Sequence, residues 1–359
     1  MYVCAITERE QWNAFLTGQS SGHLLQSYEW GELIRYQGER IYRLGALENG
    51  RLVGTMMLSV VPVPLPLSMP GLHLTWLYCS RGPAVEHPTA SALAALIEHA
   101  HAIGRREQAV VLRLEPNIAD DDSDVHAWMK AYRALGFQTN PIAVYGRRSW
   151  ALDLRPDLDQ LFANFRKAWQ QDIRIAERRG VIVREAESDA DFDAYYHLLK
   201  STSERDGFFI HSKEHHKEIL RLFASKGDAV IYLAELEGEP VAAKMLICFG
   251  GWCYDMFGAT ADSHRNFPKT HLLQFRCLQW AKEHDCTYFD FRTIPEILQP
   301  GEEMWGVYQF KKGFGGFSRL CLPTQDYVYR PLIYTAWHRA VAIRRRLRRA
   351  RHTTRTRDK

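Results

Sequence analysis

The chain has 359 residues, of which 46% are hydrophobic and 25% are charged, and its formal net charge is +4. This composition is ordinary for a globular protein with sizeable cores, and it excludes a disordered or a fibrous chain. The length predicts two domains of typical size. The longest apolar run, 55–67, is interrupted by Pro62, Pro64 and Pro66, so no stretch reaches the roughly 18 residues that a membrane span needs.

The first half of the chain predicts alternating strands and helices. Two runs of alternating residues, 41–47 and 52–61, predict a β-hairpin, because the Asn49-Gly50 pair between them is a strong turn signal. The other elements predicted here are a strand at 74–79, a helix at 90–105, a strand at 109–114, a helix at 124–135, a strand at 149–154 and a helix at 158–179.

The second half predicts the same order of elements. Strands at 229–236 and 241–249 form a hairpin around Gly238, and a third strand at 252–258 follows. A helix at 271–283 and a fourth strand at 288–291 complete the pattern. Because both halves share this order, we infer that one folding unit is duplicated. The order is typical of acetyltransferases, so the predicted fold class is α/β (α+β), with two tandem acetyltransferase-like (GNAT) domains.

The loop after the third strand argues against the usual coenzyme of such a fold. In acetyltransferase-type folds this loop wraps a pyrophosphate with backbone N–H groups, and it needs glycines because Cβ atoms would block the approach. The loop at 260–270 contains no glycine, and its counterpart at 81–88 contains one. We therefore expect the fold without its cofactor, and we expect no metal.

The cysteines predict a reducing environment. Their number is odd, no Cys-x-x-Cys pair occurs, and several lie in apolar runs, so buried free thiols and a cytoplasmic location are expected. Residues 1–10 lack the pattern of a signal peptide. The cysteines are Cys4, Cys79, Cys248, Cys253, Cys277, Cys286 and Cys321.

The C-terminal segment is rich in arginine. From Arg339 to Arg357 its positive charges exceed the net excess of the chain, so the remainder is acidic on balance. A helix predicted at 332–350 has apolar residues roughly along one side, and this pattern leaves three interpretations open. The segment 332–351 lies on an anionic membrane surface, it binds the backbone of a nucleic acid, or it is a solvated basic tail.

Several stretches, in the right order, resemble the Fem family of tRNA-dependent transferases, which add amino acids to the stem peptide of peptidoglycan precursors. The family's Trp-containing opening helix resembles 26–33, and its closing segment resembles 327–331. The other similar stretches are Ser80-Arg81-Gly82-Pro83, Leu112-Arg113-Leu114-Glu115-Pro116, Thr202-Ser203-Glu204-Arg205-Asp206-Gly207-Phe208 and Phe310-Lys311-Lys312-Gly313-Phe314.

The resemblance implies two acetyltransferase-like domains, which agrees with the duplication. The first covers 1–148 and is completed by 318–359, and the second covers 149–317. No sustained heptad repeat occurs in the second half, so the chain resembles the members without a coiled-coil arm. We expect a monomer, cytoplasmic or peripheral at the inner face of the membrane.

The reaction that the resemblance implies is aminolysis of an ester. An amine of the stem peptide attacks the aminoacyl ester of a charged tRNA, without a cofactor and without a covalent enzyme intermediate. The acceptor is lipid II or UDP-MurNAc-pentapeptide. Positioning and stabilisation of the developing oxyanion should therefore dominate catalysis.

Lys311 and Phe310 are the predicted catalytic residues. We expect Lys311 to lie between the rings of Phe310 and Phe314, while Gly313, Gly315 and Gly316 allow a substrate to approach the backbone. Lys311 then stabilises the oxyanion or holds the terminal phosphates of the tRNA. The alternative is a solvated Lys311-Lys312 pair in a turn.

Five further residues are predicted to bind substrate. The resemblance implies that Arg205 faces the phosphates of the precursor and that Trp30 belongs to the opening helix that binds it. Arg35 stands beside Ile34, where family members often carry a lysine. Arg81 could bind an anion at a strand end, and Glu115 could accept a proton from the attacking ammonium or serve as a structural hydrogen-bond acceptor.

The sequence leaves three alternatives to this function. The doubled fold could serve an N-acyltransferase acting on another metabolite or on an exported polysaccharide, or a non-catalytic adaptor that binds lipid-linked glycans. His211, His215 and His216 could approach a metal if His211 and His215 shared a helix face, but a polar helix face is the simpler interpretation.

Overall fold

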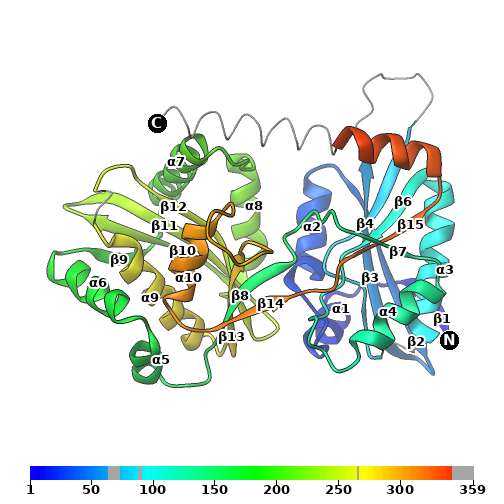
Figure 1. Cartoon of the computed structure of the whole chain (residues 1–359), viewed down its shortest axis with the longest axis horizontal. Helices are drawn as coiled ribbons and strands as arrows, with labels where there is room; N and C mark the ends of the chain where they lie inside the picture. The colour runs from blue at the N-terminus through cyan, green and yellow to red at the C-terminus, as the bar shows by residue number, and fades with distance from the viewer. Residues whose placement is uncertain (64–72, 88–90, 265–266, 342–359) are drawn as a thin grey trace.

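The computed structural model describes residues 1–63, 73–87, 91–264 and 267–341, and in this part of the chain the strands form two mixed sheets (Figure 1). Helices cover both sheets. The first sheet consists of β1 (Tyr2–Ala5), β2 (Arg40–Glu48), β3 (Arg51–Pro62), β4 (Thr75–Cys79), β6 (Ala109–Leu114), β15 (Thr324–Val328) and β7 (Gln138–Asn140) in spatial order, with β5 (Ala84–Val85) paired to β3. Its helices are α1 (Arg9–Thr17), the short 3₁₀ turn η1 (Leu24–Gln26), α2 (Tyr28–Tyr36), α3 (Ser91–Arg106) and α4 (Val125–Ala134).

The second sheet is built from the middle of the chain. Its strands, in spatial order, are β14 (Phe317–Leu320), β8 (Arg148–Asp153), β13 (Tyr288–Thr293), β12 (Trp252–Thr260), β11 (Glu239–Phe249), β10 (Ala229–Leu236) and β9 (Ile182–Glu185). Its helices are α5 (Leu158–Asn164), α6 (Lys167–Arg178), α7 (Asp189–Asp206), α8 (Lys213–Phe223) with the short turn η2 (Ala224–Lys226), α9 (Lys269–Glu283) and α10 (Trp305–Lys312).

The two hairpins confirm the shared order of elements. In each hairpin the turn is made by two consecutive residues with positive φ, of which the second is a glycine. Asn49-Gly50 joins β2 to β3, and Glu237-Gly238 joins β10 to β11. The second strand of each hairpin then pairs antiparallel with a third strand, β4 or β12. After a helix, the third strand pairs parallel with a fourth, β6 or β13.

One predicted helix is two helices. The pattern at 158–179 predicts a single helix, but the backbone leaves the helical region at Phe165, with φ −66° and ψ 151°. The Phe165 ring is buried and packs against the rings of Phe162, Phe275 and Phe314. A continuous helix would not deliver this ring to the core, and Gln170 stabilises the break by donating a 2.8 Å hydrogen bond to the Phe165 carbonyl.

The chain crosses between the sheets twice after β7. Residues 141–147 lead from β7 in the first sheet to β8 in the second, and the segment after β14 returns to the first sheet as β15. β14 still pairs with β8, so the C-terminal segment expected to join the first unit from residue 318 first bonds to the backbone of that unit at 320–322 and joins its sheet as β15 from Thr324. The two units are therefore connected by long-range strand pairing as well as by sequence.

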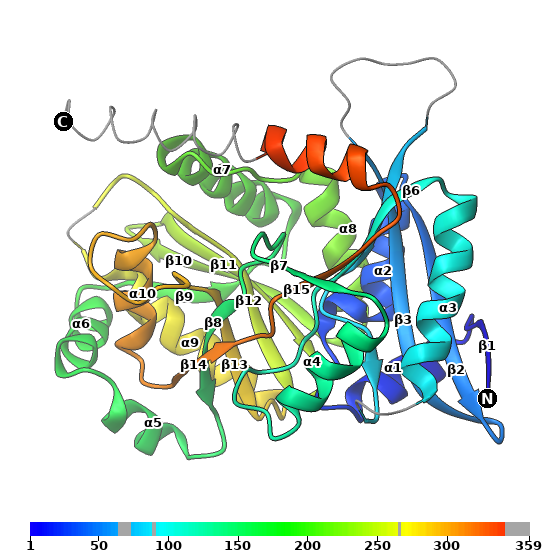
Figure 2. The same cartoon turned by 45° about the vertical axis from the view of Figure 1, so that its right-hand side comes forward.

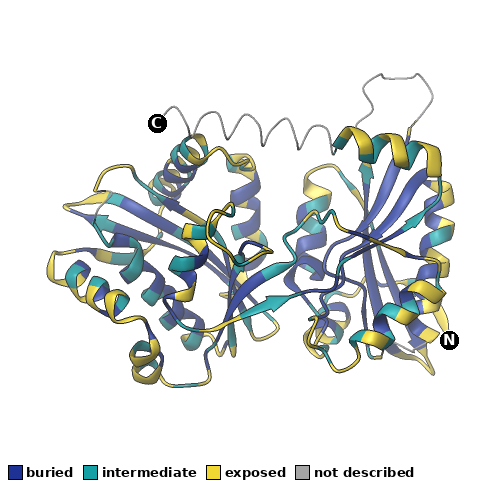
Figure 3. Ribbon diagram, in the orientation of Figure 1, coloured by how far each residue is buried: buried dark blue, intermediate teal, exposed yellow. Residues whose placement is uncertain are grey.

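An apolar core joins the two units. One cluster contains Trp12 and Leu25 of the first unit together with Ile247 and Tyr254 of the second, all buried. Figure 3 shows buried residues along the strands of both sheets. The helix that begins at 331 and is described to residue 341 lies at the same end of the molecule as α7 and α8 (Figure 2).

Candidate functional site

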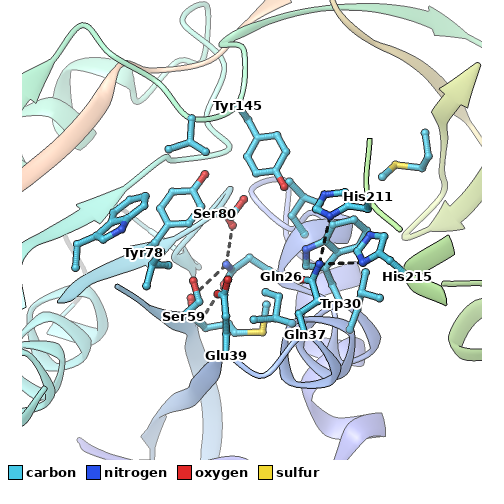
Figure 4. A pocket seen from close by; sticks show the side chains of 18 of the residues that line it. Gln26, Trp30, Gln37, Glu39, Ser59, Tyr78, Ser80, Tyr145, His211 and His215 are labelled. Atoms are coloured by element: carbon cyan, nitrogen blue, oxygen red, sulfur yellow. Dashed lines mark hydrogen bonds between the residues drawn. The ribbon is translucent and has the colours of Figure 1, made fainter. Parts of the chain in front are cut away.

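A cavity of about 340 Å³ lies between the two units. Its walls come from elements far apart in the sequence (Figure 4). The lining residues include Trp30 of α2, Gln37 just after α2, Tyr78 of β4, Tyr145 of the first crossing segment, His211 and His215 near the start of α8, and Arg292 of β13. A cavity of this size accommodates part of a small-molecule ligand.

Gln26 fixes the base of this cavity. Its side chain is fully buried, donates a 2.6 Å hydrogen bond to the Ser80 carbonyl and accepts one of 2.9 Å from the Met57 N–H. The next residue, Ser27, caps α2 by accepting a hydrogen bond from the Trp30 N–H at 3.1 Å. Together these bonds hold the start of α2 against β3 and β4, and Trp30 thereby becomes part of the cavity wall.

Glu115 and Arg81 hold the first crossing segment against the first sheet. The buried Glu115 carboxylate accepts hydrogen bonds from the N–H groups of Val144 at 2.5 Å and Tyr145 at 3.2 Å, and from the Tyr78 hydroxyl at 2.6 Å. The buried Arg81 guanidinium donates to the Gly146 carbonyl at 2.6 Å. Neither residue lines the cavity itself, but the segment that they hold does, through Val144 and Tyr145, and both charged groups are engaged with the protein.

Lys311 lies in the last turn of α10, not in a loop. Its side chain is 9% exposed, and its Nζ donates a 2.8 Å hydrogen bond to the Thr293 carbonyl at the end of β13. Burial lowers the pKa of Lys311 to about 8, against the opposing charge of Asp255. At neutral pH it therefore remains largely protonated. The expectation of a solvated lysine in a turn does not hold for Lys311.

Phe310 does not flank Lys311 as expected. Its ring packs with those of His271 at 5.1 Å and Phe314 at 5.2 Å, and its carbonyl accepts a 3.0 Å hydrogen bond from the Trp169 indole. These rings belong to the core beneath α9. Phe310 and Phe314 therefore anchor the helix that carries Lys311.

The glycines after Lys312 serve packing, which corrects the expected approach of a substrate. A Cβ atom on Gly313 would clash with the Trp169 ring, and one on Gly316 would clash with the Ala151 carbonyl. Gly316 also has φ +94°, which side chains rarely adopt. The absence of side chains here lets α10 and β14 close against the protein.

Arg205 and Arg35 lie away from the cavity lining. Arg205 follows the pattern of a helix end, since Gly207 closes α7 with φ 76°. Its guanidinium pairs with Asp206 at 2.8 Å and donates to the Thr260 carbonyl at 2.9 Å. The Arg35 side chain is 59% exposed and lies 3.5 Å from Glu32. The structure thus brings Trp30, Arg81, Glu115 and Lys311 toward one junction but leaves Arg205 and Arg35 outside it.

A buried ionic group near Lys311 is not among the residues predicted from the sequence. Lys244 of β11 pairs with Asp255 of β12 and donates to the side-chain oxygen of Gln274 in α9 at 2.5 Å. All three residues are largely buried. The sequence does indicate this group, because Lys244 and Asp255 are charged residues within otherwise apolar strands.

The described part of the loop after β12 does not fit a pyrophosphate. Lys269, at the start of α9, donates to the carbonyl of Ala261 at 2.9 Å and to the carbonyl of Ser263. The loop thus turns these carbonyl oxygens toward a buried ammonium, whereas a phosphate needs inward N–H groups.

The three histidines form a neutral cluster. His211 precedes α8 instead of sharing its face, but its ring stacks on that of His215 at 4.0 Å, and Gln37 lies 2.9 Å from His215. Burial, reinforced by His211, lowers the pKa of His215 to about 4, and burial lowers that of His216 to about 3. Within the residues that the structure describes, no group of three or more His, Cys, Asp or Glu side chains could hold a metal ion.

The described part of the C-terminal helix uses its apolar side internally. Ile333, Tyr334 and Trp337 pack on the first sheet, and the Trp337 ring lies 5.7 Å from that of Trp76. These residues are therefore not free to enter a bilayer. Residues 342–351 of the expected membrane-contact segment lie outside the described part, and no helix in the described part is long and apolar enough to cross a membrane.

Comparisons with known proteins place this geometry in context. The model of the FemAB family matches residues 7–239 and 237–341. A curated relative from Staphylococcus epidermidis RP62A, named lipid II:glycine glycyltransferase, is 22% identical over 90% of this chain and 92% of its own length. The protein of that name from Staphylococcus aureus MRSA252 is 23% identical over 92% of this chain and 93% of its own length.

The solved structures confirm the fold. The crystal structure of FemX matches with a TM-score of 0.82 and 21% identity, over 94% of this chain and 99% of that one. A tandem GNAT protein from the clavulanic acid pathway matches with a TM-score of 0.53 and 13% identity, over 91% of this chain and 98% of that one. The predicted pair of acetyltransferase-like units is therefore correct.

Proposed function

We propose that this chain, which belongs to the FemAB family, is an acyltransferase that moves an amino acid onto the stem peptide of a peptidoglycan precursor. The staphylococcal relatives that match nearly its whole length are named for such a transfer onto lipid II. The cavity between the two units supports this function, because it offers a ligand-sized space and its lining residue Arg292 precedes Thr293, which binds the buried Lys311. The acceptor is lipid II or its soluble counterpart, UDP-MurNAc-pentapeptide.

We propose an aminoacyl-tRNA as the donor, with no coenzyme. The arrangement of Lys269 supports this choice, because its ammonium faces the loop carbonyls where a coenzyme pyrophosphate would need N–H groups. An aminoacyl ester is already an activated acyl group. The protein then needs only to position the donor and the acceptor and to stabilise charge.

In the proposed reaction the neutral amine of the stem peptide attacks the ester carbonyl carbon. A C–N bond forms, negative charge develops on the carbonyl oxygen, and the C–O bond to the tRNA ribose then breaks. The proton lost by the amine is delivered to the ribose oxygen. Lys311 stabilises the developing oxyanion, and its burial strengthens this effect because the local dielectric is low.

One observation carries this assignment. The Lys311 Nζ is held 2.8 Å from the Thr293 carbonyl, and the preceding residue, Arg292, lines the cavity. The ammonium is thus fixed to the residue that directly follows a cavity-lining arginine. Its hydrogen bond to Thr293 engages one of three N–H groups, so donors are left for an oxyanion.

The test is a transfer assay with purified full-length protein. Total charged tRNA carrying labelled amino acids is incubated with lipid II or with UDP-MurNAc-pentapeptide, and mass spectrometry follows the acceptor. We expect the acceptor to gain one amino acid residue, and only from charged tRNA. No gain with any charged tRNA and either acceptor would reject this function, and binding of the acceptor without transfer would favour the adaptor alternative.

We also propose a cytoplasmic location with peripheral contact to anionic membrane through 332–351. Leu332 is 88% exposed, while Trp337 packs on the first sheet, so charge would dominate the contact over apolar insertion. Sedimentation with anionic vesicles tests this proposal. A variant lacking 342–359 should sediment less, and equal sedimentation of both proteins would reject membrane contact through the tail.

A further inference from the structure

Arg292 is a cavity-lining cation whose side chain is uncommitted. It is the one arginine among the cavity-lining residues, and within the described residues no hydrogen bond or ion pair engages its guanidinium. By contrast, Arg81 is bound to the Gly146 carbonyl, and Arg319 is bound to Asn117. An arginine left free at a cavity wall is available to a ligand anion.

A β-bulge in β13 sets the backbone conformation of Arg292. The register of β13 against β8 shifts between Asp290 and Thr293, so Phe291 and Arg292 form a bulge opposite Trp150. Arg292 has φ +68°, and its N–H is held by the Asp290 carboxylate at 2.6 Å. A positive φ is costly for a side chain of this size, and bulges of this kind redirect side chains at functional sites.

The strand pairing leaves room at this bulge. β12 and β13 pair in parallel only as far as Tyr254 and Asp290, so Arg292 lies beyond the last bridge between them. The next residue, Thr293, holds the Lys311 ammonium through its carbonyl. Arg292 therefore lines the cavity next to the residue that binds the lysine that we assign to acyl transfer.

The surrounding charge also favours an anion. His23 is buried nearby, and its pKa is lowered by burial and then by the positive charges of Arg81, Arg292 and Arg319. The imidazole is thus neutral in a region where cations gather. Glu39 is the one carboxylate among the cavity-lining residues.

We propose that Arg292 binds a carboxylate of the acceptor stem peptide and so positions its amine beside Lys311. This inference rests on the proposed function. A guanidinium matches a carboxylate with two parallel hydrogen bonds, and such a pair fixes orientation as well as position. The stem peptide carries carboxylates at its C-terminus and on its acidic residues.

The precursor phosphates are the competing source of negative charge. They are separated from the stem peptide by a sugar, and each extended residue between that sugar and the acceptor amine adds about 3.5 Å. When the acceptor amine lies beside Lys311, a peptide carboxylate is therefore closer to Arg292 than a phosphate is.

Binding measurements on the full chain separate the two sources. UDP-MurNAc-pentapeptide, versions of it with one carboxylate at a time converted to the carboxamide, and UDP alone are titrated against the wild type and against Arg292→Gln. We expect one amidation to weaken binding to the wild type at least about tenfold and to leave binding to Arg292→Gln unchanged. UDP should bind both proteins equally, and Arg292→Lys should recover part of the loss.

Arg155→Gln is the matched control, because Arg155 is an exposed arginine paired with Asp153, away from the cavity. It should bind every ligand as the wild type does. Weaker binding of UDP to Arg292→Gln would assign the residue to phosphate and overturn the proposal. So would a wild type that binds all amidated versions as tightly as the parent. Because these titrations need no tRNA, they can fail or succeed independently of the transfer assay.

Discussion

The Lys311 ammonium lies 2.8 Å from the carbonyl oxygen of Thr293, and this bond joins the last turn of α10 to the end of β13. It holds a buried charge at the residue that follows Arg292, which lines the cavity between the two units. The Lys244–Asp255 pair lies in the same region and contributes opposing charges. A fixed, desolvated donor of this kind suits stabilisation of charge in a transition state.

Lys311→Ala should lower the rate of amino-acid transfer by about a hundredfold or more, because one preorganised donor typically contributes that much. Lys312→Ala is the control, since Lys312 is exposed, its ammonium lies 5.6 Å from the Tyr308 ring, and it makes no ion pair in the described residues. Single-turnover transfer rates with saturating acceptor measure both. A Lys311→Ala rate within threefold of wild type would remove Lys311 from the mechanism.

Asp326→Asn should destabilise the protein by about 3–5 kcal/mol, because it leaves the buried Arg113 without its countercharge. Asp326 accepts hydrogen bonds from Arg113 at 2.8 and 2.7 Å, and it joins β15 to β6. Guanidinium unfolding measures the loss. Arg51→Ala, which removes the exposed pair between Arg51 and Glu86, should cost less than about 1 kcal/mol, and a similar cost for both variants would contradict this account.

Gly316→Ala should destabilise the second unit, whereas Gly306→Ala should not. A Cβ at Gly316 would meet the Ala151 backbone at a positive φ, while one at Gly306 in α10 would meet no atom within 4 Å. We expect Gly306→Ala to raise the free energy of unfolding by up to about 1 kcal/mol through helix propensity. Thermal unfolding compares them, and an unchanged melting temperature for Gly316→Ala would disprove the packing role of that glycine.

The free energy of unfolding should fall as the pH is lowered from about 6.5 toward 4. The folded pKa of His215 is about 4 and lies below the unfolded value of about 6.5, so the unfolded state binds more protons in this window. Above this window the contribution of the neutral ring is fully present. Urea unfolding at several pH values measures this dependence. The free energy of unfolding should change less steeply with pH in His215→Gln, which keeps a polar partner for Gln37. His211 and His216 should preserve part of the pH dependence. If the free energy of unfolding of His215→Gln depended on pH as steeply as that of the wild type, the role of His215 would be contradicted.

Local patterns were sufficient for most of the fold. The Asn49-Gly50 and Gly238 turns lie between alternating strands, so the two hairpins could be predicted from short-range chemistry alone. The helix break at Phe165 could not, because the residues around it favour a helix and only the core explains why the ring leaves it. The presence of two similar units follows from the repeated order of elements, which can also be recognised in the sequence.

The site depends on contacts between distant segments. Sequence alone selected Trp30, Arg81, Glu115 and Lys311, which the structure brings toward one junction, but it offered no reason to single out Arg292 or Gln26. Arg292 is aimed by a bulge between β13 and β8, and Gln26 is fixed by carbonyl and N–H groups more than thirty positions away in the first unit. The sequence thus determined the elements, their order and the family, because these rest on local patterns. Only the tertiary structure decided which charges are buried, which are paired and which face the cavity, because those properties belong to pairs of residues that the chain brings together on folding.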